Sequence, residues 1–199
     1  MKKKIIITGG LGYIGTELCK LYSGVSWHHQ IIVIDNRFIS ERVNQIRNWN
    51  IEFVQGDILD KNLVEKYCKE ADVVHHLAGV TDVPRTKSES SELQDKKIKE
   101  VGEKGTQNIL DVIDDECKII FPSTHVVYEG LEKVKTEIKE SEDTKPVLSY
   151  STSKAINEEQ LKKSGKNYII LRLGSVYGYS TDSMRIDIMP NLFSKIASQ

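Results

Sequence analysis

The sequence contains no long hydrophobic run and no excess of charge of either sign. Its 199 residues include 28 lysines and arginines against 29 aspartates and glutamates, a formal net charge of −1. A surface balanced in this way indicates neither nucleic acid nor a membrane as a partner. No apolar segment approaches the roughly 20 residues that span a bilayer, and the early lysines precede a short strand-like run with no cleavage-site pattern. We therefore expect a cytoplasmic protein.

Cysteine is also scarce. Cys19, Cys68 and Cys117 are far apart and lack the close pairing typical of a metal or redox motif. We expect all three to be small buried hydrophobic residues. His28 and His29 are adjacent, but no further ligand is spaced to complete a metal site, so we interpret them as loop residues and expect no metal.

What the sequence does contain is a regular alternation of short apolar runs and segments with helical spacing. With 39% hydrophobic residues, the chain can bury one sizeable core. Parallel strands that alternate with helices predict an α/β protein with a doubly wound parallel sheet, the Rossmann fold, and ligands at the carboxyl ends of the strands. The predicted strands span residues 5–7, 31–34, 51–54, 73–77, 118–121 and 168–173.

The first strand runs into a glycine-rich turn, from Thr8 to Gly15. Gly9, Gly12 and Gly15 suit a phosphate-binding turn, in which glycines permit a tight turn, a close backbone approach to a pyrophosphate and close packing of helix on strand. The helix that follows presents its N-terminal N–H groups to the anion. We therefore predict a dinucleotide site here.

An acidic residue follows at the expected distance. The second apolar run ends in Asp35, about twenty residues beyond Gly15. At that place a carboxylate hydrogen-bonds the adenosine ribose hydroxyls of NAD and repels the 2′-phosphate of NADP. Arg37 lies close enough to weaken this preference. NAD is the predicted cofactor.

Tyr150 and Lys154 stand four residues apart and share one face of a predicted helix. An ammonium group beside a phenol favours the phenolate, so we expect Lys154 to lower the pKa of Tyr150. Thr124, at the end of the fifth strand, adds a hydroxyl that can hold the same substrate oxygen. Together the three residues are typical of a site in which a carbinol loses a proton while hydride passes to NAD.

These motifs resemble the extended short-chain dehydrogenase/reductases of the NAD-dependent epimerase/dehydratase family, over residues 3–178. The resemblance implies a nucleotide-sugar substrate, with Thr124, Tyr150 and Lys154 as catalytic residues and Thr124 and Ser175 beside the substrate. It also implies which residues contact the cofactor. They are Gly9, Gly12, Tyr13, Ile14 and Gly15 in the turn, Asp35 and Asn36 at the ribose, Asp57 and Ile58 flanking adenine, Leu77, Ala78 and Gly79 after strand four, and the Tyr150/Lys154 pair.

The sequence departs from the family pattern in three places, one of them a pair of residues. Gly102 and Ser175 stand where the family often has asparagine, which puts full catalytic competence in question. Gly102 and Gly105 lie inside a predicted helix over residues 98–112, where they indicate close packing or a bend. His125 and Val126 replace the Asp-Glu pair of sugar dehydratases, which argues against dehydration. We interpret His125 as packed at the strand end, with a general base as the alternative.

Three functions remain open at this point. The first is an epimerase that oxidises a sugar hydroxyl and returns hydride to the other face. The second is a reductase or dehydrogenase with net NAD(P)-dependent hydride transfer on a keto sugar or small alcohol. The third is an NAD-binding protein with impaired catalysis.

The resemblance also predicts how the chain is organised. Residues 1–178 are expected to form the NAD-binding domain, and residues 179–199 to begin a substrate lobe whose first helix has Pro190 in its first turn. We expect the chain to be the cofactor-binding portion of a longer protein, or a truncated form of it. A homodimer is implied, formed by the helix over residues 98–112 and the helix after Tyr150. Val101 and Ile109 are candidate contacts, with a core position as the alternative.

Overall fold

The computed structural model describes residues 1–80, 89–180 and 183–199. Strands and helices alternate along the chain as the periodicity predicts. The helices and strands are β1 (Lys4–Thr8), α1 (Tyr13–Ser23), β2 (Gln30–Asp35), α2 (Ser40–Asn48), β3 (Glu52–Gln55), α3 (Lys61–Cys68), β4 (Val73–His76), α4 (Glu92–Lys99), a π-helical segment (Glu100–Lys104), α5 (Gly105–Leu110), β5 (Lys118–Thr124), a 3-10 helix (His125–Tyr128), α6 (Ser149–Lys163), β6 (Asn167–Leu173) and α7 (Met189–Ala197).

The strands form one parallel sheet in the order β3-β2-β1-β4-β5-β6, so the predicted doubly wound Rossmann fold is confirmed. The strand order reverses between β1 and β4. The register pairs Thr8 with both Ile34 and His76, and it pairs Thr124 with Leu173. The carboxyl ends of β1, β2, β4, β5 and β6 therefore meet at one edge of the sheet, which is where ligands bind in this architecture.

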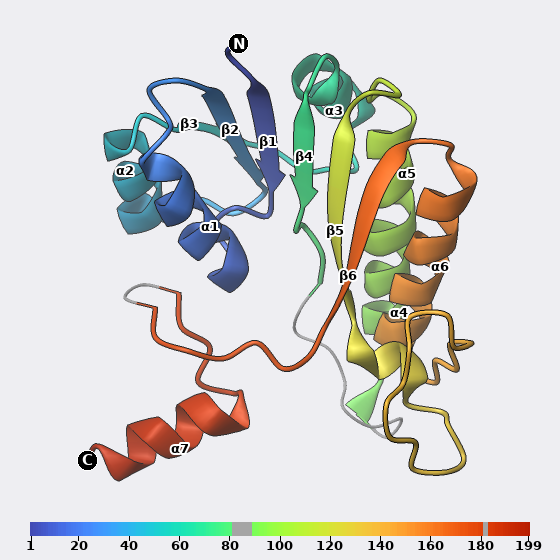
Figure 1. Cartoon of the computed structure of the whole chain (residues 1–199). Helices are drawn as coiled ribbons and strands as arrows, with labels where there is room; N and C mark the ends of the chain where they lie inside the picture. The colour runs from blue at the N-terminus through green and yellow to red at the C-terminus, as the bar shows by residue number, and fades with distance from the viewer. Residues whose placement is uncertain (81–88, 181–182) are drawn as a thin grey trace.

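Two hydrophobic clusters cover the two faces of the sheet. On one face α1 and α2 pack on β1 and β2, around side chains such as Ile7, Val33 and Val43. On the other face α3, α5 and α6 pack on β4 and β5, around Val74 and Phe121 (Figure 1). The strands read as near-continuous apolar runs because both of their faces are buried. At the outer strand β6, by contrast, Ile169 and Leu171 remain about 40% exposed.

The three cysteines lie in these clusters, as expected. Cys19, Cys68 and Cys117 are each 1% exposed or less. Burial raises the thiol pKa of Cys19 and of Cys68 to about 12, so both are neutral hydrophobic residues at physiological pH.

The helix predicted over residues 98–112 is not continuous, because a π-helical segment (Glu100–Lys104) separates α4 from α5. A Cβ atom on Gly102 would lie 2.2 Å from Ser153 Oγ, and one on Gly105 would lie 2.3 Å from Ile58 Cδ1. Asn157 Nδ2 donates to the Gly102 carbonyl at 3.1 Å. This side-chain hydrogen bond satisfies one backbone carbonyl within the π-helical segment, where the backbone hydrogen-bond pattern differs from that of an α-helix. Close packing and a break in the helix thus occur together.

The same helix bears on the expected dimer. Ile109 is fully buried in the hydrophobic cluster under β4 and β5, and Val101 packs against that cluster. Ile109 is therefore a core residue rather than a dimer contact, because its side chain fills space between α5 and the sheet.

After Leu173 the chain leaves the sheet, passes beneath α1 and ends in α7, which stands apart from the sheet (Figure 1). Pro190 lies in the first turn of α7, as predicted. The polar stretch at residues 81–88, between β4 and α4, lies outside the described residues. Within the described ranges, no helix has both the length and the apolar character needed to cross a membrane.

The glycine turn generates a stability prediction. Gly9 has φ +69°, and a Cβ atom on it would lie 2.7 Å from Ala78 N and 2.8 Å from Ala78 Cα. We expect Gly9→Ala to lower the free energy of unfolding by about 3 kcal/mol or more, because backbone strain and a backbone clash add together. The measurement is urea unfolding followed by circular dichroism.

The matched control is Gly24→Ala at the C-cap of α1. Gly24 has φ −66°, and a Cβ atom there would meet nothing within 4 Å. This change should shift stability by less than about 1 kcal/mol. Equal effects of the two substitutions would contradict the close approach of the turn to β4.

Candidate functional site

The turn between β1 and α1 is built for close backbone contacts. A Cβ atom on Gly15 would lie 2.5 Å from Gly9 O, so the first turn of α1 rests directly on the glycine turn. Gly12 differs from Gly9 and Gly15, because a Cβ atom on it would meet, among the described residues beyond its own neighbours in the chain, only Gly9 O within 4 Å, at 3.2 Å. The absent side chain of Gly12 thus leaves open space on the outer side of the turn, where a ligand can approach the backbone.

The N-terminus of α1 matches an anion. Gly12 is its N-cap and supplies no side-chain cap, and the first turn holds no acidic residue. The amides of Tyr13, Ile14 and Gly15 have no intrahelical acceptor, because the first bond of the helix runs from Thr16 N to the Gly12 carbonyl, and they point out of the helix end. Together with the positive end of the helix dipole, they fit a pyrophosphate.

Asp35 is tied to this turn. Its Oδ2 accepts a hydrogen bond from Leu11 N at 3.0 Å, and its Oδ1 accepts from Arg37 N at 3.0 Å and Arg37 Nε at 3.5 Å. The carboxylate therefore holds the turn in place as well as standing at the end of β2. Two carboxylate oxygens provide about four acceptor sites, so capacity for ribose hydroxyls remains.

The next strand end is connected to β2 through side chains. Asn36 Nδ2 donates to Asp57 Oδ2 at 3.1 Å, and Leu59 N donates to Asp57 Oδ1 at 2.9 Å. Ile58 is 4% exposed and packs into the hydrophobic cluster, while its carbonyl accepts from Asn108 Nδ2 at 2.9 Å. Because the side chain of Ile58 is buried, only its backbone is available to contact a ligand.

A buried hydrogen-bond relay fixes the end of β4. His76 Nδ1 lies 2.9 Å from Thr8 Oγ1, and His76 Nε2 lies 3.0 Å from Thr106 Oγ1. Thr8 Oγ1 also accepts from Ala78 N at 3.2 Å. Burial, and secondarily the charge of Lys154, lowers the pKa of His76 to about 3. The relay therefore holds a neutral imidazole between β1 and α5, and it positions the Leu77-Ala78-Gly79 segment.

Tyr150 and Lys154 lie on the first two turns of α6, facing β5. Lys154 Nζ donates to the Pro122 carbonyl at 2.8 Å and stands 4.4 Å from the Phe121 ring centroid and 5.9 Å from that of Tyr150. Tyr150, Lys154, Ala78 and Gly79 line a narrow cavity of about 40 Å³. The structure thus brings the α6 pair next to the end of β4, whose Ala78 contacts the glycine turn.

The expected pKa relation within this pair is wrong. Burial raises the pKa of Tyr150 above its ordinary value, and the opposing charge comes from Arg185. Lys154 is not among the groups that shift the pKa of Tyr150, and its ammonium donates to the Pro122 carbonyl. Burial lowers the pKa of Lys154 itself to about 8.

Thr124 and Ser175 lie at the same edge. Thr124 is 8% exposed at the end of β5, and its Oγ1 caps the following 3-10 helix by accepting from Val126 N at 3.3 Å. Ser175 is exposed, two residues beyond Leu173, the partner of Thr124 in the register. The two residues predicted to lie beside the substrate thus follow or end neighbouring strands, β5 and β6.

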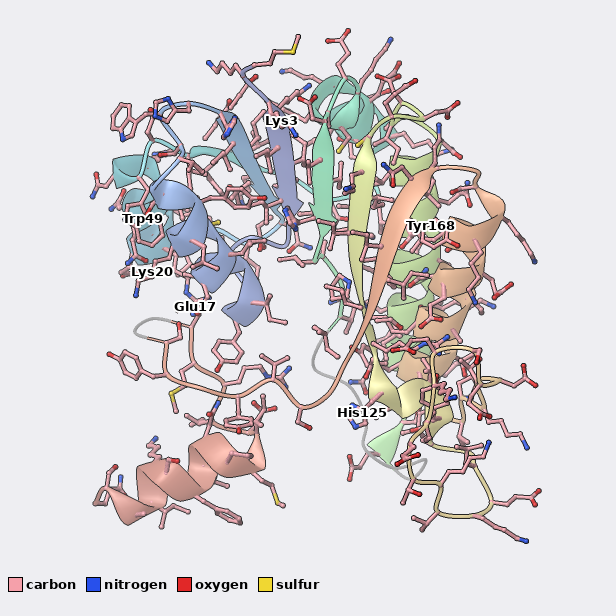
Figure 2. All side chains as sticks on the ribbon, in the orientation of Figure 1. Lys3, Glu17, Lys20, Trp49, His125 and Tyr168 are labelled. Carbon is pink, nitrogen blue, oxygen red and sulfur yellow. The ribbon has the colours of Figure 1, made fainter. Side chains whose placement is uncertain are left out.

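His125 is exposed rather than packed. Figure 2 shows it at the carboxyl end of β5, directed away from the sheet. Its Nδ1 lies 3.1 Å from the Leu173 carbonyl, and a carbonyl only accepts, so Nδ1 carries the proton. The side chain is exposed because the chain turns into the 3-10 helix directly after Thr124.

Sequence reasoning missed two groups that support the site. Arg172 on β6 donates Nε to Glu158 Oε1 at 2.9 Å and Nη2 to Oε2 at 2.6 Å, and Ser123 Oγ also donates to Glu158. Burial alone would raise the pKa of Glu158, but the hydrogen bonds from Arg172 and Ser123 lower it. The spacing of Glu158 four residues after Lys154 was a usable signal, because it places both on one helix face.

The second missed group is at the start of α6. Glu129 accepts hydrogen bonds from Val147 N at 2.8 Å, from Leu148 N at 2.7 Å and from Ser151 Oγ. It joins the irregular stretch at residues 129–145 to the helix that carries Tyr150. No local pattern marks this contact, which spans about twenty residues.

Comparisons with known proteins identify the family. The model of the NAD dependent epimerase/dehydratase family matches residues 5–199. A UDP-N-acetyl-alpha-D-glucosaminuronate decarboxylase from Bacillus cytotoxicus is 35% identical over 130 residues, which cover 64% of this chain and 38% of that protein. A putative UDP-glucose 4-epimerase from Methanocaldococcus jannaschii is 33% identical over 186 residues, covering 89% of this chain and 57% of that protein.

The fold is also similar to that of solved structures. The UDP-glucose 4-epimerase from Brucella ovis, in complex with NAD, superposes with a TM-score of 0.68 at 29% identity, covering 92% of this chain and 54% of that chain. The chain spans about half the length of the curated relatives it matches.

The buried relay predicts a pH dependence of stability. The folded protein keeps His76 neutral down to about pH 3, whereas the unfolded chain protonates it near pH 6.5. Between these values the unfolded state binds more protons, so stability falls as the pH falls through this window. We expect His76→Gln to reduce the slope of unfolding free energy against pH by up to about 1.4 kcal/mol per pH unit between pH 6 and pH 4.

Urea unfolding at several pH values gives this slope. The exposed His28 provides the control substitution, His28→Gln, which should keep the wild-type slope. An unchanged slope in His76→Gln would show that the imidazole is not held neutral by the fold.

Proposed function

The chain belongs to the NAD-dependent epimerase/dehydratase family, and from this membership we propose that it binds NAD and uses it to oxidise and re-reduce a nucleotide sugar. The observation that carries the proposal is the meeting of two groups at the end of β4. Gly9 touches the backbone of Ala78 from one side, and Ala78 and Gly79 share a cavity with Tyr150 and Lys154 on the other.

The proposed cofactor contacts follow the strand ends. The amides of Tyr13, Ile14 and Gly15 hold the pyrophosphate, with Gly12 leaving room for it and Gly9 packed against the backbone of Ala78. Asp35, with Asn36 beside it, takes the adenosine ribose, and the Asp57-Ile58 backbone flanks the adenine. Leu77, Ala78 and Gly79 follow the cofactor toward Tyr150 and Lys154. The similar Brucella ovis enzyme is in complex with NAD, which supports NAD as the cofactor.

The proposed chemistry places Tyr150 as the acid/base. The cofactor supplies the hydride acceptor and donor. The phenolate form of Tyr150 takes the proton of the substrate hydroxyl and becomes the phenol, while Thr124 holds the same oxygen through its own hydroxyl. Because burial raises the pKa of Tyr150, the phenol is well suited to return this proton, and removal of the proton requires a nearby positive charge. Arg185 supplies the charge that acts on Tyr150 in this structure, whereas Lys154, whose pKa burial lowers to about 8, remains largely protonated at pH 7 and donates to the Pro122 carbonyl.

Epimerisation is the outcome we favour. The Methanocaldococcus jannaschii relative is a putative 4-epimerase, and the Asp-Glu pair of dehydratases is replaced here by His125-Val126. By analogy with the matched relatives, a UDP-sugar is the substrate class. Net production of NADH would instead indicate the dehydrogenase alternative, and NAD binding without turnover would indicate a catalytically impaired protein.

The proposal extends to organisation. Residues 1–178 carry the cofactor groups, and residues 179–199 begin the part that reads the sugar. We further propose a homodimer through the outer surfaces of α4 and α6, which pack side by side. Leu93 on α4 is 81% exposed, as an interface residue would be in the isolated protomer.

Cofactor preference provides one test. We expect NAD to bind more tightly than NADP, because Asp35 repels a 2′-phosphate. Arg37 is largely exposed beside Asp35, where it can attract that phosphate. Arg37→Ala should therefore widen the preference for NAD. Isothermal titration with both cofactors decides the matter, and tighter NADP binding by the wild type would refute the assignment.

The acid/base role of Tyr150 provides a second test. Tyr150→Phe should lower turnover of UDP-glucose or a related UDP-sugar by about 10²–10⁴-fold while leaving NAD affinity nearly intact, since only the proton-transferring oxygen is lost. Lys154→Ala should weaken both turnover and NAD binding. Product formation is followed by chromatography and NADH by absorbance.

The control for this series is Tyr168→Phe. Tyr168 lies near the amino end of β6, far from the candidate site (Figure 2). This variant should retain wild-type turnover. If Tyr150→Phe also retained it, the acid/base assignment would be wrong.

A further inference from the structure

The edge of the sheet where the strands begin contains a second cavity. It has a volume of about 320 Å³ and lies between the amino ends of β1, β2 and β3 and the end of α2. Its polar lining consists of Lys2, His29, Gln30, Arg47, Asn50 and Glu52. Figure 2 shows Lys3 at the amino end of β1 and His125 at the opposite end of the sheet. This amino-end cavity is therefore separate from the candidate active site.

Hydrogen bonds fix the walls of the amino-end cavity. Lys3 N donates to His29 Nδ1 at 3.2 Å, and Gln30 N donates to the Lys3 carbonyl at 2.8 Å, so the residues before β1 are held against the start of β2. Asn50, whose φ of +56° turns the chain from α2 into β3, donates Nδ2 to the Ser26 carbonyl at 3.2 Å. The cavity is thus formed in advance of binding, which lowers the entropic cost of holding a ligand.

Three charged side chains of this lining are available to a ligand. Lys2, Arg47 and Glu52 are exposed, and within the part of the chain that the structure describes no ion pair or side-chain hydrogen bond engages them. None of the three has to give up a protein partner in order to bind. Because the lining has two cations and one carboxylate, it attracts an anion.

The donors of the lining suit a phosphate group. Lysine offers three N–H donors, and the planar fork of arginine matches phosphate in a bidentate geometry. His29 adds a further donor, because its Nδ1 accepts from the Lys3 amide and the proton of the neutral ring is therefore on Nε2.

Glu52 determines what else the ligand must carry. A carboxylate only accepts hydrogen bonds, so it repels a bound phosphate unless the same ligand also brings donors. Hydroxyl groups are such donors, and the Gln30 amide can both donate to them and accept from them. The volume of about 320 Å³ is at the lower end of small-molecule sites, which favours a small ligand. A small phosphate ester with several hydroxyl groups therefore matches the lining better than inorganic phosphate.

We propose that the amino-end cavity is a second ligand site, which binds a small sugar phosphate. Lys2, Arg47 and His29 hold the phosphate. Glu52 and Gln30 bind the hydroxyl groups. The site lies at the opposite edge of the sheet from the proposed NAD and substrate groups, so this inference does not rest on the proposed function.

Isothermal titration of the NAD-loaded protein with glucose 6-phosphate, inorganic phosphate and glucose tests the proposal. Loading with NAD keeps the glycine turn, the other candidate anion site, occupied. The wild type should bind glucose 6-phosphate about tenfold more tightly than inorganic phosphate, because the hydroxyl groups add hydrogen bonds. Glucose should bind more weakly than either, because it lacks the anion.

Two variants separate the contributions of the phosphate and the hydroxyl groups. Arg47→Gln should weaken binding of both phosphate probes about tenfold or more, because a charge-assisted contact is lost. Glu52→Val should remove most of the preference for glucose 6-phosphate over inorganic phosphate, because the acceptor for the hydroxyl groups is gone while valine remains favourable in a strand. Lys20→Gln, at an exposed lysine of α1 outside the cavity, is the matched control and should change neither affinity.

Three results would overturn the inference. They are a wild type that does not bind glucose 6-phosphate, a wild type that binds inorganic phosphate as tightly, and an Arg47→Gln variant with wild-type affinity for both probes. Repeating the titrations without NAD locates the probe. Unchanged affinity supports the amino-end cavity, whereas binding seen only without NAD would place the probe at the glycine turn and contradict the proposal. Failure of the wild type to bind NAD would count against the proposed function alone.

Discussion

The close approach of β1 and β4 at their carboxyl ends is the constraint on which the rest of the site depends. Thr8 accepts hydrogen bonds from both Leu77 N and Ala78 N, through its carbonyl and its hydroxyl respectively. Gly9 then lies against the backbone of Ala78 with no room for a side chain. The strand order reverses at this point, so the helices after β1 and after β4 diverge to opposite faces and leave the crevice open.

Burial determines how the α6 pair can act. An ammonium and a phenol on neighbouring helical turns are both moved toward their neutral forms when water is excluded. Lys154 obtains its hydrogen bond from Pro122, and Arg185 supplies the positive charge that acts on Tyr150. Burial raises the pKa of Tyr150, and the charge that opposes this effect comes from a residue 35 positions later, on the segment that Tyr13 joins to α1.

Much of this architecture could be predicted from the sequence, because short local patterns of residues determine it. Runs such as Ile5-Ile6-Ile7 mark strands buried on both faces, and glycines at 9, 12 and 15 mark a turn that tolerates no side chain. The candidate residues from Asp35 to Lys154 were assigned by spacing and resemblance, and the structure gathers them along one sheet edge. Their roles in binding and catalysis stay predictions.

The contacts that sequence reasoning missed are set by packing between distant segments. The π-helical segment follows from how Gly102 meets Ser153, some fifty residues away. The buried Arg172–Glu158 pair and the cap that Glu129 places on α6 likewise join segments with no local signal. Exposure of His125 depends on a 3-10 helix capped by Thr124, which the apolar pattern of the strand does not reveal.

The central claim is that one NAD molecule contacts both sides of the β1–β4 crevice. Hydrogen–deuterium exchange of the protein, with and without NAD, tests it most directly. The account predicts that NAD slows exchange in two separate stretches, the turn at residues 8–15 and the start of α6 at residues 149–154, while α2 and α3 exchange as before. Protection of the turn alone, or of neither stretch, would contradict it.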